Sequence, residues 1–372
     1  MRIKDFDLER YFARWEFNVR YLLCASDIEG MKMADLLRLA DEETLKRWEE
    51  LSLGYTESLG HPLLRREIAG MYEGTSPDEV LVFCGAQEAI FAFVNVAVGP
   101  ADHVIVTWPG YQSLYEVARA TGADVTLLPL EAARGFELEV EALRRAMRPN
   151  TRLLVINFPH NPTGAVLRPE TLEAVLALAE EANAFVLSDE VYRLLELEGA
   201  TPPAAVERSR RAISLGVMSK VYGLAGLRVG WLVARDRELL ARCAAYKDYL
   251  SICTSAPSEI LALMALRRRS QLLERSREIL RDNLTRLDRF FHDWAGTFEW
   301  VRPRAGSVGF PRILRGMSSD ELARELVESE GVLILPGSVF GDTDNHFRIG
   351  FGRTNLPEAL AGLERFATRR LG

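Results

Sequence analysis

Short hydrophobic segments alternate with longer amphipathic segments through the middle of the chain. The short segments predict strands, and the longer ones, in which apolar residues recur every three or four positions, predict helices. The expected strands are 80–84, 103–107, 124–128, 152–157, 184–188, 211–215 and 230–234, and the expected helices are 87–98, 113–121, 139–147 and 169–182. Because these strands are apolar almost throughout, they indicate a parallel sheet covered on both faces, which binds ligands beyond the carboxyl ends of its strands.

The two ends of the chain have a different character. Residues 1–20 are amphipathic and predict an arm or helix, followed by a short strand and turn at 22–30 and helices at 33–51 and 62–72. A long helical segment spans 257–291, and beyond it strands (298–301, 332–335, 346–351) mix with helices (318–330 and from 357). We therefore expect a large domain over 46–285 and a small α+β domain over 286–372, which residues 1–45 join as an arm and part of its structure.

Composition excludes several classes of protein. The 372 residues are 48% hydrophobic and 27% charged, as in an ordinary globular chain, and the net charge of -7 argues against nucleic-acid binding. No apolar run is long enough to span a bilayer and no leader is recognisable, so we expect a cytoplasmic protein without a membrane partner. The four cysteines and five histidines show no ligand spacing, so we expect no metal site.

The stretch 217–231 places a lysine, Lys220, between two apolar strands on a backbone that contains three glycines. The chain has five lysines and 41 arginines, so this lysine is not a routine basic residue. A lysine in a desolvated pocket has a lowered pKa and forms a Schiff base with an aldehyde cofactor. Arg228 offers a planar fork suited to a phosphate. The simpler interpretation is a strand-turn-strand with an incidental Lys-Arg pair.

Three other groups follow predicted strands. Gly85, Ala86 and Gln87 join a strand to a helix, whose free amides suit an anion. The segment 157–164 contains Asn161 in a turn that its prolines and glycine also explain locally. Asp189 ends a buried strand, where a carboxylate is costly unless it meets a cation, such as a protonated pyridine nitrogen.

Together these groups supply what pyridoxal 5′-phosphate requires. Lys220 would form the Schiff base, Asp189 would keep the ring nitrogen protonated, and Tyr192 and Asn161 would bind the phenolate oxygen. Tyr111 would stack on the ring. The phosphate would be held by five residues: Gly85, Ala86, Gln87, Ser219 and Arg228.

The chain resembles the class I/II aminotransferases, α/β enzymes of pyridoxal phosphate fold type I. The resemblance is carried by the motifs 161–164, 189–192 and 219–228, by a Tyr-x4-Gly-x3-Leu-Arg pattern that begins at Tyr55, and by the ending 331–349. It implies a mainly parallel seven-stranded sheet and a homodimer in which Tyr55 reaches the partner subunit's phosphate. It also implies that Arg348 grips the substrate α-carboxylate, together with Asn161, and that an amino acid and a 2-oxo acid exchange an amino group in ping-pong fashion, with Lys220 as general base.

Two stretches depart from the usual pattern of this family: 25–30, where an apolar-Gly segment is typical, and 305–310, where a Gly-Gly-aromatic pattern is typical. Glu16 and Asp27 look similar to positions in arginine-handling relatives, the capreomycidine synthases and the pyridoxal-dependent arginine oxidases. Such carboxylates would select a cationic side chain. The alternative is that Ser26 or Asp27 caps a helix and Glu16 is merely solvated.

Two enzyme classes therefore stay open on the same fold: an aminotransferase, and a lyase, cyclase or oxidase that acts on a cationic amino acid such as arginine or a derivative. A cofactor-bound DNA-binding regulator is disfavoured because the N-terminal residues are acidic and aromatic rather than basic. A nicotinamide enzyme is disfavoured because no GxGxxG follows a strand.

Overall fold

A seven-stranded sheet organises the chain, whose residues 2–372 are described by a computed structural model. Its spatial order is β2 (Val80–Phe83), β8 (Gly230–Ala234), β7 (Ala212–Val217), β6 (Phe185–Asp189), β5 (Thr151–Asn157), β3 (His103–Trp108) and β4 (Asp124–Pro129). Only β8 runs antiparallel to its neighbours, and the other four pairings are parallel. The predicted mainly parallel sheet is confirmed.

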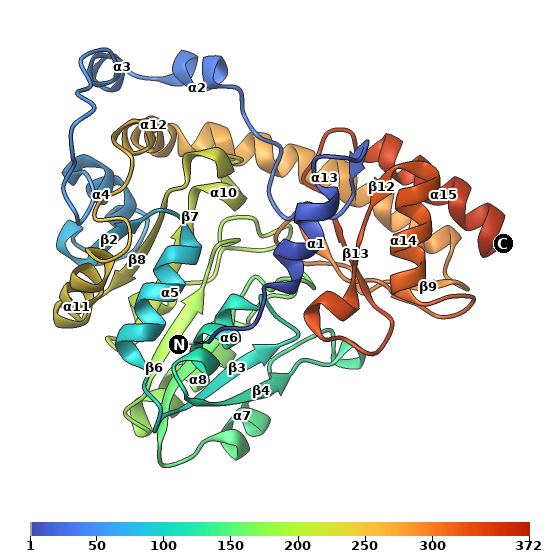
Figure 1. Cartoon of the computed structure of the whole chain (residues 1–372), viewed down its shortest axis with the longest axis horizontal. Helices are drawn as coiled ribbons and strands as arrows, with labels where there is room; N and C mark the ends of the chain where they lie inside the picture. Colours follow the sequence, from blue (N-terminus) through green and yellow to red (C-terminus); the bar gives the residue numbers. More distant parts are fainter. Residues whose placement is uncertain (1) are drawn as a thin grey trace.

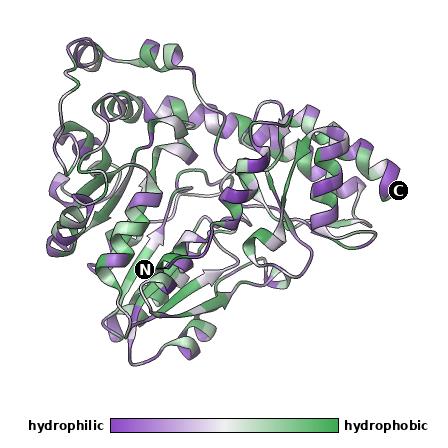
Figure 2. Ribbon diagram, viewed as in Figure 1, coloured by the Kyte–Doolittle hydropathy of each residue, from purple (hydrophilic) through white to green (hydrophobic). Residues whose placement is uncertain are grey.

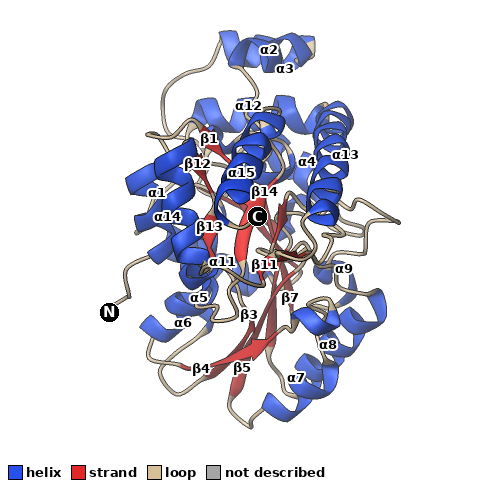
Figure 3. Cartoon of the chain, turned by 90° about the vertical axis from the view of Figure 1, so that its right-hand side faces the viewer, coloured by secondary structure: helices blue, strands red, loops and turns tan. Residues whose placement is uncertain are grey.

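Helices cover both faces of this sheet (Figure 3). One face carries α5 (Ala86–Ala97), α6 (Ser113–Ala120) and α11 (Arg237–Lys247), and the other carries α7 (Val140–Ala146), α8 (Pro169–Glu181) and α9 (Ala205–Arg208). Successive side chains of a strand point to opposite faces. In β5, Leu153 and Val155 accordingly join one hydrophobic core, while Leu154 and Ile156 join the other. Apolar residues line the helix faces next to the sheet, and polar ones face outward (Figure 2).

The N-terminal segment and the C-terminal region pack together beside the sheet (Figure 1). The N-terminal strand β1 (Tyr21–Leu22) pairs in parallel with β12 (Val332–Leu333). The rest of this region consists of β10 (Val308–Gly309), β14 (Phe347–Gly350), β13 (Leu335–Pro336), β9 (Phe298–Glu299), β11 (Arg312–Ile313), α14 (Ser319–Glu330) and α15 (Leu356–Arg370). The domain boundaries at 45/46 and 285/286 stay a prediction.

Two long helices predicted from the sequence are each divided in the structure. Residues 33–51 form α2 (Met33–Leu39) and α3 (Glu42–Glu49), because Asp41 accepts a hydrogen bond from the Thr44 amide (2.8 Å) and caps a new helix. Residues 256–293 form α12 (Ala256–Arg267) and α13 (Arg269–Asp293), since Arg268 leaves helical geometry at φ −109°, ψ 19°. The predictions of single helices over 33–51 and 257–291 were wrong.

The remaining elements are short. They are α1 (Asp7–Trp15), α4 (Pro62–Ala69), α10 (Met218–Val221) and the 3-10 turns Pro77–Glu79, Ala132–Arg134, Ala225–Leu227 and Gly337–Phe340.

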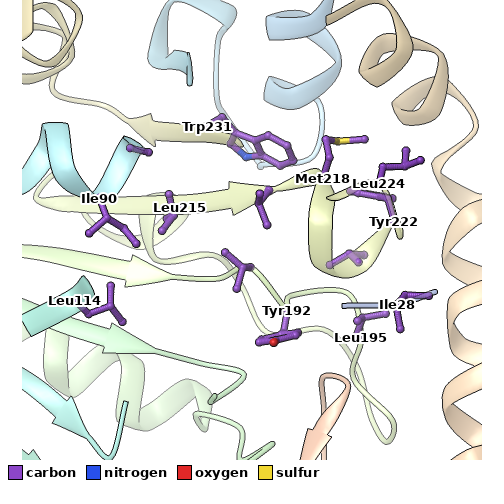
Figure 4. Packing of buried hydrophobic residues seen from close by; sticks show 14 of the residues in the cluster. Ile28, Ile90, Leu114, Tyr192, Leu195, Leu215, Met218, Tyr222, Leu224 and Trp231 are labelled. Atoms are coloured by element: carbon purple, nitrogen blue, oxygen red, sulfur yellow. The ribbon is translucent and has the colours of Figure 1, made fainter. Parts of the chain in front are cut away.

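Buried hydrophobic side chains, among them Trp231 and Met218, pack around the end of β7, where α10 begins (Figure 4). Trp231 of β8 lies directly opposite Gly216 of β7, where a Cβ atom would come within 2.4 Å of the indole ring. The indole nitrogen donates a hydrogen bond to the Tyr72 hydroxyl (3.0 Å). Met218, the first residue of α10, is fully buried and fixes the start of this helix. The backbone that carries Lys220 is therefore held rigidly.

The segment 23–29, between β1 and α2, crosses the sheet's carboxyl edge and is fastened to β14. The Gly350 amide donates to the Leu23 carbonyl (2.9 Å), and a Cβ atom on Gly350 would lie 1.8 Å from the Ala25 carbonyl oxygen. Only glycine leaves room for this contact, because both partners are backbone atoms.

We expect Gly350→Ala to lower the free energy of unfolding by about 1–3 kcal/mol, because the added methyl group overpacks two backbone segments. Urea denaturation followed by circular dichroism measures this. Gly296→Ala is the matched control, since a Cβ atom there meets nothing within 4 Å. Equal stability of the two variants would contradict the close approach at Gly350.

Candidate active site

A cavity of about 320 Å³ opens at the carboxyl edge of the sheet. It lies at the ends of β5, β6 and β7, between the sheet and residues from both chain ends. Twelve of the predicted site residues line it: Glu16, Asp27, Ala86, Gln87, Tyr111, Asn161, Asp189, Tyr192, Ser219, Lys220, Arg228 and Arg348. The edge of the sheet that the sequence indicated is thus where these side chains meet.

Lys220 is half-buried on α10, three residues after the buried strand β7 ends. Its Nζ donates a hydrogen bond to Ser26 Oγ (2.8 Å). Burial lowers the pKa of the Lys220 amine, an effect that Arg348 strengthens and that the carboxylates of Asp27 and Asp189 oppose. The amine is therefore more readily deprotonated than that of an exposed lysine.

Asp189 is a buried carboxylate at the end of β6, only 4% exposed. Its Oδ1 accepts a hydrogen bond from the Val191 amide (3.2 Å), and no arginine or lysine of the described chain lies within ion-pair distance. Burial raises the pKa of Asp189 to about 7. A cationic group placed in the cavity would relieve this cost.

Arg348 of β14 is 1% exposed. It donates to Asn161 Oδ1 (3.1 Å) and to the Cys24 carbonyl (2.8 Å), while its Nε has no partner in the described chain. Because the Asn161 oxygen accepts from Arg348, the amide nitrogen of Asn161 is left as a donor. The guanidinium is an unneutralised cation beside the cavity, which suits a carboxylate.

Tyr192 is buried, and its hydroxyl donates to the Ser26 carbonyl (2.9 Å). The sequence suggested that this hydroxyl donates to a ligand oxygen, which requires that it release the Ser26 carbonyl. Burial raises its pKa to about 12, so the hydroxyl keeps its proton.

Gly85 does not line the cavity but makes room for a neighbour. Its φ of 89° suits glycine, and a Cβ atom there would lie 2.6 Å from Nη2 of Arg228. Ala86 and Gln87 begin α5, so their amides lie at the helix end that favours anions. The Gln87 side chain donates to Ser113 Oγ (2.7 Å).

Tyr55 lies apart from the cavity. It is 89% exposed and is not among the residues that line it. Within one chain, the structure does not bring Tyr55 to the other predicted site residues.

Three acidic residues of the N-terminal segment, Glu9, Glu16 and Asp27, also line the cavity. Asp27 forms an ion pair with Arg353 (3.0 Å), and helix α2 begins only at Met33, so neither Ser26 nor Asp27 caps a helix. Glu16 is half-buried, burial raises its pKa, and no lysine or arginine of residues 2–372 pairs with it. The expectation that Ser26 or Asp27 caps a helix was wrong, because no helix starts there.

Sequence reasoning missed Glu9, Phe12 and Ser26, which also line the cavity. The periodicity of α1 offered a signal: residues 9, 12 and 16 fall on one face of a helix. Ser26 and Arg353 gave no such signal, because segments far apart in the sequence bring them there.

The residues present fit pyridoxal phosphate. A buried carboxylate without a cation, a lysine with a lowered pKa and a helix N-terminus beside Arg228 surround one cavity. They match the ring nitrogen, the aldehyde and the phosphate of this cofactor in turn.

The model of the family described as aminotransferase class I and II matches residues 22–363. The chain is 32% identical to capreomycidine synthase of Streptomyces vinaceus over 368 residues, 97% of this chain and 92% of the relative. It is 31% identical to the arginine–pyruvate transaminase of Pseudomonas aeruginosa over 338 residues, 86% of this chain and 83% of the relative.

Two solved structures are similar over the whole chain. A PLP-dependent aminotransferase from Streptococcus suis superposes with a TM-score of 0.94 at 31% identity, covering 100% of this chain and 99% of that one. The PLP-dependent cyclase OrfR gives 0.92 at 28% identity, covering 100% and 98%.

The chain therefore belongs to the class I and II aminotransferase family and has the pyridoxal phosphate fold type I. Its cofactor is pyridoxal 5′-phosphate. Among residues 2–372, no cluster of three or more histidine, cysteine or acidic side chains is arranged to hold a metal. In the same residues no helix combines the length and hydrophobicity that crossing a bilayer requires.

The burial of Asp189 generates a pH-dependent stability in protein stripped of its cofactor. Because the pKa rises from 3.8 to about 7 on folding, the unfolded carboxyl loses its proton first. The contribution of Asp189 to stability is thus intact below about pH 4 and is lost as the pH rises through 7. The difference in free energy of unfolding between Asp189→Asn and wild type should therefore grow in favour of the variant by roughly 2–4 kcal/mol from pH 4 to pH 8.

Urea denaturation at a series of pH values measures this gain. Glu259, whose pKa is also raised to about 7, titrates equally in both proteins and cancels in the comparison. The exposed Asp344→Asn is the control and is expected to follow wild type. Parallel profiles for wild type and Asp189→Asn would contradict the burial argument.

Proposed function

We propose that this chain is an aminotransferase that moves an amino group between a cationic L-amino acid and a 2-oxo acid. The observation that carries the proposal is that Lys220, Asp189 and Arg348 line one cavity together with the acidic residues Glu9, Glu16 and Asp27. Lys220 and Asp189 suit the cofactor, and Arg348 suits the carboxylate of an amino acid. The acidic residues suit a positive charge on its side chain.

Each part of the cofactor has a set of residues suited to hold it. Lys220 would bind the aldehyde carbon, Asp189 the ring nitrogen, and Asn161 and Tyr192 the phenolate oxygen. Tyr111 would face the ring. The α5 amides at Ala86 and Gln87, with Ser219 and Arg228, would hold the phosphate. When bound, the cofactor acts as an electron sink for the bond broken at the substrate α-carbon.

Lys220 is the proposed general base. A neutral amine is needed to take a proton from carbon, and burial of Lys220 lowers its pKa in that direction. Arg348, with its unpartnered Nε, is the proposed receptor for the α-carboxylate. Because this guanidinium is buried, the pair would form in a low-dielectric site and would orient the α-carbon toward the amine.

The proposed substrate class rests on the acidic residues of the cavity. Glu9 of α1 and Glu16, the residue that ends this helix, lie two turns apart and both line the cavity. Asp27 is already paired with Arg353, so we assign contact with the substrate cation to Glu16 and Glu9. A guanidinium forms two parallel hydrogen bonds with a carboxylate, which favours an arginine-like side chain. The printed activity of the Pseudomonas relative, arginine–pyruvate transamination, agrees with this assignment.

We also propose a homodimer in which Tyr55 of one subunit contacts the phosphate held by the other. In support, Tyr55 is 89% exposed, and two further large apolar side chains, Leu53 and Tyr249, are exposed as well. The Thr56 hydroxyl donates to the Thr254 carbonyl (3.2 Å), so the segment of Tyr55 contacts the segment that follows Tyr249. Exposed large apolar side chains are typical of an interface.

A second candidate is a cyclase or another non-transaminating enzyme for the same substrate class. It is favoured by the likeness of the whole chain to capreomycidine synthase and to the PLP-dependent cyclase. The two functions differ in whether a 2-oxo acid is needed for repeated turnover.

We expect the loaded enzyme to convert one equivalent of L-arginine per active site when no 2-oxo acid is present, and many equivalents once pyruvate is added. The reason is that a transaminase keeps the amino group until an acceptor removes it. Mass spectrometry of ¹⁵N passing from arginine into alanine measures the transfer. L-Leucine and L-glutamate serve as comparison donors. Repeated turnover of arginine without pyruvate would support the cyclase, lyase or oxidase instead.

Replacing Glu16 tests the substrate class. We expect Glu16→Gln to reduce the ratio of kcat/KM for arginine over leucine by about tenfold to one hundredfold, because one charge-assisted hydrogen bond is lost. Asp7→Asn, which removes a carboxylate of α1 that does not line the cavity, is the matched control. An unchanged ratio in Glu16→Gln would remove the basis for a cationic substrate.

A further inference from the structure

Ser26 occupies a fixed position above the cavity. The segment that carries it is fastened on both sides of the serine: Arg348 donates to the Cys24 carbonyl (2.8 Å), and the Glu29 amide donates to the Gly352 carbonyl (2.8 Å). Both bonds come from the C-terminal region around β14. The serine is therefore held over the cavity by residues more than 300 positions away in the sequence.

The backbone of Ser26 receives two further hydrogen bonds. Its carbonyl oxygen accepts from the Tyr192 hydroxyl (2.9 Å) and from Ser307 Oγ (2.8 Å). These donors lie beyond β6 and just before β10 respectively, so the carbonyl is held from two sides. A serine fixed in this way has a defined direction for its side chain.

That side chain meets the lysine amine. Ser26 Oγ accepts a hydrogen bond from Lys220 Nζ at 2.8 Å, and no other hydrogen bond of this amine to a described residue is present. A serine hydroxyl has lone pairs to accept from an ammonium group and a proton to donate elsewhere. None of the proposed roles of Lys220, Asp189 or Arg348 involves the Ser26 hydroxyl.

We propose that Ser26 is a catalytic residue whose hydroxyl holds the Lys220 amine in place through proton transfer. The inference rests on the proposed function of Lys220 as general base. As the base acts, the C–H bond at the α-carbon breaks, the proton forms an N–H bond on Nζ, and the electron pair stays with the substrate and cofactor. The Ser26 oxygen then accepts a charge-assisted hydrogen bond from the new ammonium group, which stabilises it and keeps it aimed at the substrate.

Charged groups from several elements also face this amine. They are Asp27 from the segment of Ser26, Arg348 from β14, Asp189 at the end of β6, Glu9 from α1 and Glu16 just beyond α1. All five are unchanged by a substitution at Ser26. A change in the proton affinity of Lys220 after removal of the hydroxyl therefore reports the hydrogen bond itself.

The test uses the cofactor-free chain and an amine-reactive acylating reagent. Only the unprotonated amine reacts, so mass spectrometry of the Lys220 peptide across a pH series gives the midpoint of its titration. Loss of an acceptor that favours the charged amine lowers this midpoint. We expect Ser26→Ala to lower it, Ser26→Thr to restore it, and Ser329→Ala, which removes an exposed hydroxyl of α14 that does not line the cavity, to leave it unchanged.

With loaded enzyme, we expect Ser26→Ala to lower kcat by about tenfold to one hundredfold with little change in KM, and Ser26→Thr to recover most of this loss. An unchanged or raised titration midpoint in a folded Ser26→Ala variant would overturn the proposal, as would an equal shift in Ser329→Ala. Circular dichroism establishes folding, and Ser26→Cys, whose sulfur is a weak acceptor, is expected to lower the midpoint as well and replaces Ser26→Ala if that variant does not fold. If the wild-type enzyme transfers no amino group but Ser26→Ala still lowers the titration midpoint of Lys220, the proposed function is wrong. The hydrogen bond between Ser26 and Lys220 is then still supported.

Discussion

The carboxylate of Asp189, buried at the end of a parallel strand without a cationic partner, is the constraint around which the site is built. Such a group raises the free energy of the folded chain unless a positive charge arrives. The proposed partner is the ring nitrogen of pyridoxal phosphate, the cofactor of this family. On that proposal cofactor binding would be coupled to stability, because the bound ring would also remove an electrostatic cost of folding.

Two parts of the chain supply the charged groups of the cavity. The sheet edge supplies Lys220 and Asp189, whereas Arg348 and the acidic residues Glu9, Glu16 and Asp27 come from β14 and the N-terminal segment. On the proposed roles, the sheet would position the cofactor and the two chain ends would position the groups that meet a substrate. This division allows substrate preference to change while the cofactor chemistry is retained.

The segment 23–29 joins these two parts. Through Ser26 it contacts Lys220 and Tyr192, and through Asp27 it pairs with Arg353. The position of this segment depends on a close backbone approach at Gly350. A change in packing there would therefore move Ser26 and with it the hydrogen bond to the Lys220 amine. Relatives named for transamination and for cyclisation share this fold, and the contacts of this segment are a place where such activities can diverge.

The sequence by itself determined the sheet, its flanking helices and the residues at the strand ends, since alternating apolar segments and short motifs such as 219–228 are local signals. It misjudged the helices at 33–51 and 257–291, where the Asp41 cap and the break at Arg268 interrupt a continuous apolar period. Only the tertiary structure decided that Asp27 is neutralised by Arg353, that Glu9 joins Glu16, and that Ser26 meets Lys220. These contacts join residues up to 326 positions apart, and no local pattern encodes such a distance.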